Sequence, residues 1–132
     1  FMGDPQNLTQ LVLNLLTNSV ESLGESKGII TITTRSGEYS ESTLHSPFLD
    51  IQPETGKYVH LRVSDNGPGI PTKFISQIFD PFFTTKFPGR GLGLAAVLGI
   101  VNQHRASIKV LSTPNSGTHF DLYFPACKIS RC

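Results

Sequence analysis

The sequence predicts an α+β fold: a two-layer α/β sandwich with helices on one face of a largely antiparallel sheet. Three observations carry this prediction. Apolar residues recur at helical spacing near the N-terminus, a second apolar helix pattern follows a glycine-rich stretch, and four segments read as strands. At 132 residues the chain is long enough to form one core. We expect a single domain over 1–132, with the core in 1–125 and a tail at 126–132.

The first third of the chain predicts a helix, a strand and an insertion. Asp4-Pro5 reads as a helix N-cap followed by proline at the first helical position. The helical repeat then runs through Leu8, Leu11, Val12, Leu15, Leu16, Ser19, Val20 and Leu23. Residues 29–36 alternate and are β-branched, as a strand requires. Residues 37–56 are polar and turn-rich, and we expect a surface insertion there.

The rest of the chain supplies the remaining strands and helices. The predicted elements are a strand at 57–65, a turn at 66–71, a short helix at 72–78, a helix over Leu92–Gln103, and strands at 106–112 and 118–124 around a turn at 113–117. Because consecutive strands joined by tight turns pair antiparallel, the sheet is expected to be largely antiparallel.

Composition excludes several classes of protein. A net charge of +1 with 16% charged residues argues against a dedicated nucleic-acid binder. The apolar run Gly91–Val101 is far shorter than the roughly 20 residues of a membrane span. Cys127 and Cys132 form neither a disulfide framework nor a zinc motif. We therefore expect a cytoplasmic domain without direct membrane contact.

Two polar clusters have the residue types of a ligand site. Asn14 and Asn18 share a face of an otherwise apolar helix, either as satisfied polar edge residues or as oxygen ligands for a hard cation such as magnesium. Asp65 ends a strand and opens the turn at 66–71. That turn is either only a tight turn, or a place where the carboxylate accepts a hydrogen bond from an exocyclic amine while glycines let a flat ring approach.

Two glycine clusters complete the set. Gly91 and Gly93 open the second long helix, and the free N–H groups of a helix start attract phosphates. With Ala96 they satisfy a dinucleotide-binding pattern, which we reject because no strand precedes it. Gly117-Thr118 on its own is a hairpin signal.

Five motifs in order resemble one family, the catalytic ATP-binding domain of bacterial sensor histidine kinases. The motifs are Asn14-Leu-Leu-Thr-Asn18, Asp65-Asn-Gly-Pro-Gly69, Phe79-Asp-Pro-Phe-Phe-Thr-Thr-Lys86, Gly89-Arg-Gly-Leu-Gly93 and Gly117-Thr118. These domains belong to the superfamily of DNA gyrase B, the heat-shock chaperone of ninety kilodaltons and the mismatch-repair clamp. The resemblance implies a Bergerat-type ATP-binding fold with a mixed, mostly antiparallel sheet.

The resemblance also implies how ATP and Mg²⁺ would be held. Asn18 matches the magnesium ligand, and Asn14 lies one turn earlier, at a catalytic position where it would assist either the metal or a phosphate. Asp65 matches the carboxylate that accepts a hydrogen bond from the adenine amino group, and Thr118 matches a hydroxyl that supports this aspartate, usually through water. The other implied contacts are Gly67 and Gly69 giving the ring room, Ile70 packing on its face, Phe79, Phe82 and Phe83 anchoring a lid, Lys86 reaching the terminal phosphate, and Gly91, Leu92, Gly93 and Leu94 in the phosphate-binding segment.

One departure bears on the reaction. Gyrase and the heat-shock chaperone carry a water-activating glutamate at the position of Asn14, and a neutral amide cannot act as a general base. This favours transfer of the terminal phosphate to a partner, as in an ATP-dependent protein-histidine kinase. A gyrase-type ATPase clamp and a nucleotide-sensing module without catalysis remain as alternatives.

The resemblance further implies partners outside this chain. The four histidines lack the helical motif of a phospho-acceptor. We therefore expect a fragment of a longer kinase, whose acceptor is a histidine-containing dimerisation domain of the same protein and whose downstream partner is a response regulator. The sequence leaves open whether the parent protein is membrane-anchored.

Overall fold

The computed structural model describes residues 5–23, 27–80 and 92–126, and within them it confirms the α+β class. The elements in chain order are α1 (Pro5–Leu23), β1 (Ile30–Tyr39), α2 (Glu41–Leu44), β2 (Gly56–Asp65), the 3-10 helix η1 (Thr72–Gln77), α3 (Leu92–Gln103), β3 (Ser107–Thr113) and β4 (Gly117–Pro125). Each predicted helix and strand is present, with bounds that differ from those expected by three residues at most. The short helix at 72–78 is a 3-10 turn rather than an α-helix.

The four strands form one sheet in the order β1-β2-β4-β3. All three pairings are antiparallel. Among the strands that the structure describes there is thus no parallel pair, and the mixed character expected from the family resemblance is not seen. β4 lies in the interior of the sheet, because both β2 and β3 pair with it.

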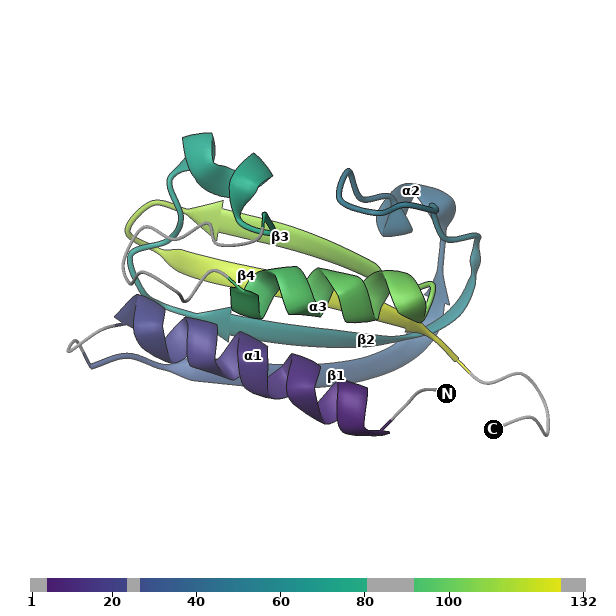
Figure 1. Ribbon diagram of the computed structural model, residues 1–132, viewed down its shortest axis with the longest axis horizontal. Coiled ribbons are helices and arrows are strands. Elements are labelled where there is room, and N and C mark those ends of the chain that lie inside the picture. The colour runs from purple at the N-terminus through teal and green to yellow at the C-terminus, as the bar shows by residue number, and fades with distance from the viewer. Residues whose placement is uncertain (1–4, 24–26, 81–91, 127–132) are drawn as a thin grey trace.

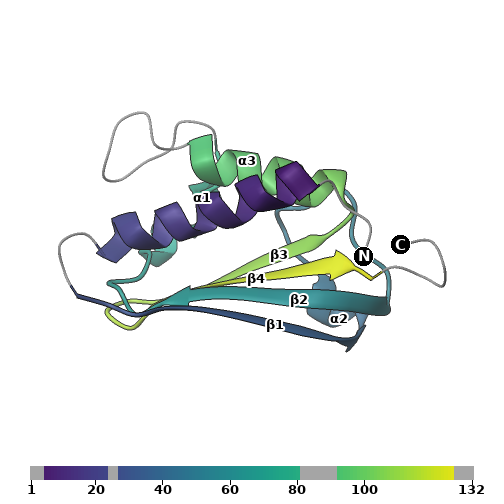
Figure 2. The same ribbon diagram turned by 90° about the horizontal axis from the view of Figure 1, so that it is seen from below.

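The two long helices lie on the same face of the sheet, as Figures 1 and 2 show. Leu11 and Leu15 of α1 are fully buried against it, as are Val63 of β2 and Phe120 and Leu122 of β4. Leu11 and Leu15 are four residues apart and so lie on one face of the helix, and Phe120 and Leu122 are two apart and so lie on one face of the strand. The main core therefore lies between the helical layer and the sheet.

The expectation of a surface insertion at 37–56 is wrong in two respects. Its first three residues extend β1 to Tyr39, which pairs with Gly56. Leu44 is fully buried and Leu49 is 9% exposed. The polar composition of the segment hid these two leucines, whose burial helps to hold the segment against the fold.

The face of the sheet opposite the helices carries a second, smaller cluster. Leu44 of α2 packs there with Tyr58 and Tyr123. Beside it, Asp121 accepts hydrogen bonds from Arg62 Nε at 2.6 Å and pairs with His60 Nε2 at 2.7 Å. Burial acts to raise the pKa of Asp121, but these two partners outweigh it and hold that pKa below its usual value.

α3 ends in a turn in which one residue has a left-handed backbone conformation. Arg105 adopts a left-handed conformation with φ of 55°, and the N–H of Ala106 donates to the carbonyl of Val101 at 3.0 Å. Glycine is usual at this position after a helix, and here an arginine adopts the same left-handed conformation. None of the helices described in residues 5–23, 27–80 and 92–126 has the length and apolar character that crossing a bilayer requires.

Candidate functional site

Asp65 and Thr118 face each other across the end of β2 and the start of β4. They are register partners in the antiparallel pair. Asp65 is 6% exposed and Thr118 is 2% exposed. Asp65 Oδ1 accepts a hydrogen bond from the N–H of Gly67 at 2.9 Å, which bends the chain back over the carboxylate. A buried carboxylate and a buried hydroxyl therefore lie side by side on the helix-facing side of the sheet.

Two glycines around this pair are required by the backbone. Gly69 has φ of +78°, and a Cβ there would lie 2.5 Å from the carbonyl oxygen of Thr113. Gly117 has φ of +122°, and a Cβ there would overlap the carbonyl oxygen of Asp65. Both conformations are ones that residues with side chains rarely adopt. The missing side chains let the turn at 66–70 and the start of β4 pack closely.

The turn at 66–70 is fixed from two sides, a feature that the sequence analysis did not find. One side is the segment before β1 and the other is the β3–β4 hairpin. The bonds are Ile29 N–H to Asn66 Oδ1 at 2.8 Å, Asn115 N–H to the Pro68 carbonyl at 2.8 Å, and Ile70 N–H to Ser112 Oγ at 2.6 Å. Nothing in the sequence pattern distinguishes Ser112 from other strand serines, because its partners are distant in the chain.

The two asparagines of α1 lie on its flank toward α3. Asn7 occupies the same flank, and its Nδ2 lies 3.5 Å from Oε1 of Gln103 at the end of α3. α1 and α3 run in opposite directions, and α1 and β2 end at the same side of the molecule (Figure 1). Asn18, near the end of α1, therefore lies toward the start of α3 and above the end of the sheet that carries Asp65, while Asn14 lies one turn earlier, at the middle of α1.

The two asparagines differ in what they bind within the protein. Asn14 Oδ1 accepts a hydrogen bond from Gln10 Nε2 at 2.7 Å. Asn18 is half-buried, and its amide has no hydrogen bond within the part of the chain that the structure describes. The amide of Asn18 is thus available for an external ligand.

The other predicted site residues fall in three groups. Ile70 and Leu94 are half-buried and pack against the core. Phe79 is 5% exposed, and its ring lies edge-to-face on that of Phe48, with the ring centroids 4.6 Å apart. Leu92 and Gly93 form the first turn of α3. Four others lie outside the described residues, namely Phe82, Phe83, Lys86 and Gly91. The structure therefore brings together Asp65, Gly67, Gly69, Ile70 and Thr118 at one end of the sheet.

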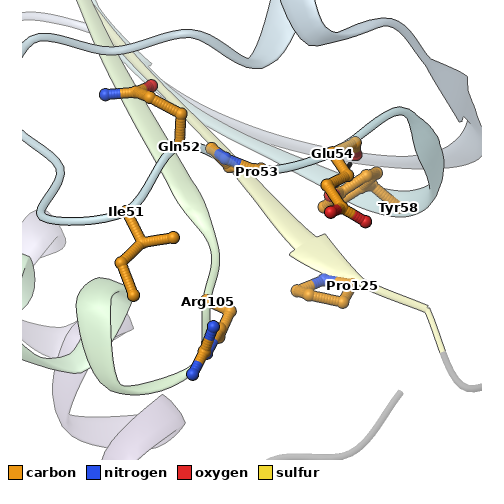
Figure 3. A pocket seen from close by; sticks show the side chains of 7 residues that line it. All are labelled: Ile51, Gln52, Pro53, Glu54, Tyr58, Arg105 and Pro125. Carbon is orange, nitrogen blue, oxygen red and sulfur yellow. Dashed lines mark hydrogen bonds between the residues drawn. The ribbon is translucent and has the colours of Figure 1, made fainter.

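A separate pocket of about 270 Å³ lies at the other end of β2, where β4 finishes (Figure 3). It is lined by Ile51, Gln52, Pro53, Glu54, Tyr58, Arg105 and Pro125. The hydroxyl of Tyr58 donates to the carbonyl of Glu54 at 2.6 Å. None of the predicted site residues lines this pocket, so it is distinct from the cluster around Asp65.

Two sensor kinases of known class are similar in sequence to this chain over nearly its whole length. Sensor histidine kinase ZraS of Escherichia coli (strain K12) is 38% identical over 123 residues, which are 93% of this chain and 22% of the relative. Sporulation kinase A of Bacillus subtilis (strain 168) is 37% identical over 123 residues, or 93% of this chain and 17% of the relative. The chain thus spans about a fifth of the length of these curated relatives.

Solved structures of the same kind have the same fold. The nucleotide-free catalytic domain of histidine kinase ThkA gives a TM-score of 0.68 at 31% identity, covering 93% of this chain and 68% of that one. Full-length ShkA in complex with AMPPNP gives 0.66 at 25% identity, covering 90% and 21%. Residues 3–128 match the family described as histidine kinase-, DNA gyrase B-, and HSP90-like ATPase. This chain belongs to that ATPase family.

Proposed function

We propose that this chain binds Mg-ATP and transfers the terminal phosphate to a histidine on a separate dimerisation domain of a two-component sensor kinase. The product phosphohistidine would then supply a response regulator. The relatives named as sensor histidine kinases support this reading. The observation that carries it is the buried pair of Asp65 and Thr118 beside a turn with glycine at the strained positions.

The geometry around Asp65 suits an adenine ring. One carboxylate oxygen is engaged by Gly67 N–H, which leaves Oδ2 as an acceptor for an exocyclic amine. A Cβ on Gly69 would meet the carbonyl oxygen of Thr113, so the missing side chain lets the turn that follows Asp65 pack closely on the β3–β4 hairpin. Ile70 supplies an apolar side chain at the end of the same turn. Together they would hold the base by one charge-assisted hydrogen bond and by apolar contact.

The residues around α1 suit a magnesium-bound phosphate group. Magnesium takes oxygen ligands and shares its sites with phosphates, so one asparagine oxygen is a sufficient protein ligand. Asn18 would hold the ion, which when bound offsets the negative charge of the phosphates. Among the described residues, no group of three His, Cys, Asp or Glu side chains offers a competing site.

The type of reaction is inferred from Asn14, whose amide side chain cannot act as a general base. In the proposed transfer, a nitrogen of the acceptor imidazole forms a bond to the γ-phosphorus, and the bond from that phosphorus to the β,γ-bridging oxygen breaks, releasing ADP. No water needs to be activated. Asn14 cannot take a proton, so it would orient ligands without promoting hydrolysis. The start of α3 would contribute N–H groups directed at the phosphates.

A binding experiment tests the adenine assignment. Asp65→Asn removes the charge of the predicted acceptor and should weaken ADP and ATP binding by about 2–4 kcal/mol, or roughly 30- to 1000-fold, by calorimetry. The matched control is Asp121→Asn, the same change at an aspartate that is 7% exposed on the opposite face of the sheet. That variant should bind ADP as the unchanged chain does. Equal ADP affinity for Asp65→Asn and the unchanged chain would contradict the assignment.

A transfer experiment tests the reaction. The chain is mixed with the acceptor domain of its own parent protein and with ATP labelled on the γ-phosphate, and label on the acceptor is expected. Asn18→Ala should remove the magnesium dependence of ATP binding and leave adenosine binding unchanged. Label that appears only as free phosphate would favour an ATPase, and loss of adenosine binding in Asn18→Ala would indicate a structural role for Asn18.

A further inference from the structure

One serine outside the predicted site contacts both parts of it. Ser112 lies near the end of β3, and its Oγ accepts a hydrogen bond from Ile70 N–H at 2.6 Å. The same oxygen lies 3.0 Å from Thr118 Oγ1 and 3.2 Å from the carbonyl oxygen of Gly117. Ser112 therefore joins the turn that follows Asp65 to the hydroxyl that faces Asp65.

The hydrogen count of the hydroxyl limits how these contacts are made. A serine has one hydrogen to donate and two lone pairs. The Gly117 carbonyl can only accept and Ile70 N–H can only donate. All three contacts are satisfied together when Ser112 donates to Gly117 and Thr118 donates its hydrogen to Ser112. In that arrangement the hydrogen of Thr118 is used, and the lone pairs of its oxygen are left for a ligand.

We propose that Ser112 is a positioning residue that makes Thr118 an acceptor and so selects a 6-amino purine over a 6-oxo purine. The proposal rests on the proposed function, because it concerns the base bound at Asp65. With Thr118 fixed as an acceptor, it and Asp65 both present lone pairs to the base. An amino group satisfies them, whereas the oxygen of a 6-oxo purine meets acceptors only.

Burial makes this orientation consequential. Thr118 is 2% exposed and Asp65 is 6% exposed, so water does not readily replace a lost partner. Without the Ser112 oxygen, the hydroxyl of Thr118 rotates freely and can donate its hydrogen to a 6-oxo group. Removing Ser112 should thus improve binding of the wrong base relative to the right one.

The test compares the affinities of ADP and inosine diphosphate (IDP), measured by calorimetry in magnesium buffer. Ser112→Ala should lower the preference for ADP over IDP by about tenfold. Ser112→Thr keeps the hydroxyl and should retain the preference. The matched control is Ser116→Ala, the same change at an exposed serine of the same hairpin, which should leave the ratio within about twofold. A merely structural role would lower the melting temperature and leave the ratio unchanged.

A double-mutant cycle identifies the route of the effect. In a Thr118→Val background, Ser112→Ala should no longer change the ADP to IDP ratio. An unchanged ratio in Ser112→Ala alone, or an equal change in both backgrounds, overturns the proposal. If Ser112→Ala does not fold, Ser112→Cys gives the same test, and loss of the fold in both shows a structural role and overturns it. Failure of the unchanged chain to bind ADP instead refutes the proposed function, and this proposal with it.

Discussion

Replacing Gly117 by alanine tests the packing that shapes the candidate site. Gly117 has φ of +122°, and its Cβ would overlap the carbonyl oxygen of Asp65. The backbone conformation costs a residue with a side chain about 1–3 kcal/mol. Forcing a methyl group against a fixed carbonyl costs about 1–3 kcal/mol more, because β2 or β4 must shift. Gly117→Ala should therefore lower the free energy of unfolding by about 2–6 kcal/mol, a large share of the roughly 5–15 kcal/mol of a typical domain.

The assay is urea denaturation followed by circular dichroism, with Gly99→Ala as the control. Gly99 lies inside α3, and a Cβ there meets nothing within 4 Å. The same change at that position should raise the free energy of unfolding by about 1 kcal/mol, because alanine is the better helix former. A loss below about 1 kcal/mol for Gly117→Ala would refute the argument that the missing side chain lets β4 approach Asp65.

Three further predictions concern burial, charge and turnover. Ser19 is fully buried, and its Oγ has no partner among the described residues, so Ser19→Ala should raise the free energy of unfolding by about 1 kcal/mol in thermal melts. The lowered pKa of Asp121 means that its ion pairs stabilise the fold above about pH 4 and cease to do so as the pH falls through that lowered pKa. Arg62→Ala should accordingly cost about 1 kcal/mol at pH 7 and less near pH 3, a modest figure because the arginine side chain is 42% exposed; an equal cost at both values would count against the pairing. The chain alone should release phosphate from ATP well below about 1 per second, and Asn14→Glu should raise that rate; ordinary enzymatic turnover abolished by Glu21→Gln would show an ATPase instead.

The local elements were predictable because each has a short-range signature. α1 follows from Pro5 and from leucines spaced three and four apart, and α3 begins and ends at the residues that the pattern gave, Leu92 and Gln103. The β3–β4 hairpin follows from its turn residues. The segment 37–56 was misassigned because its polar composition outweighed two leucines whose burial depends on distant strands.

The candidate site also has residues that the sequence predicted and contacts that it did not. Asp65, Asn18 and Thr118 could be chosen from the sequence, because they stand in motifs whose order resembles a known family. The contacts of Ser112 could not be, since they join residues up to 42 positions apart in the sequence. Those contacts exist only after the sheet has brought the β3–β4 hairpin beside the turn at 66–70.

The amino-acid sequence by itself determined the two long helices, the four strands, the family and the residue types of the site, because periodicity, caps and motifs act over a few residues. The tertiary structure alone decided which groups meet: that Gly117 must lack a side chain because of Asp65, and that one hydroxyl links Ile70 to Thr118. The physical reason is that close packing and the choice of hydrogen-bond partners depend on strand register. That register is fixed only when the whole sheet assembles against the helices.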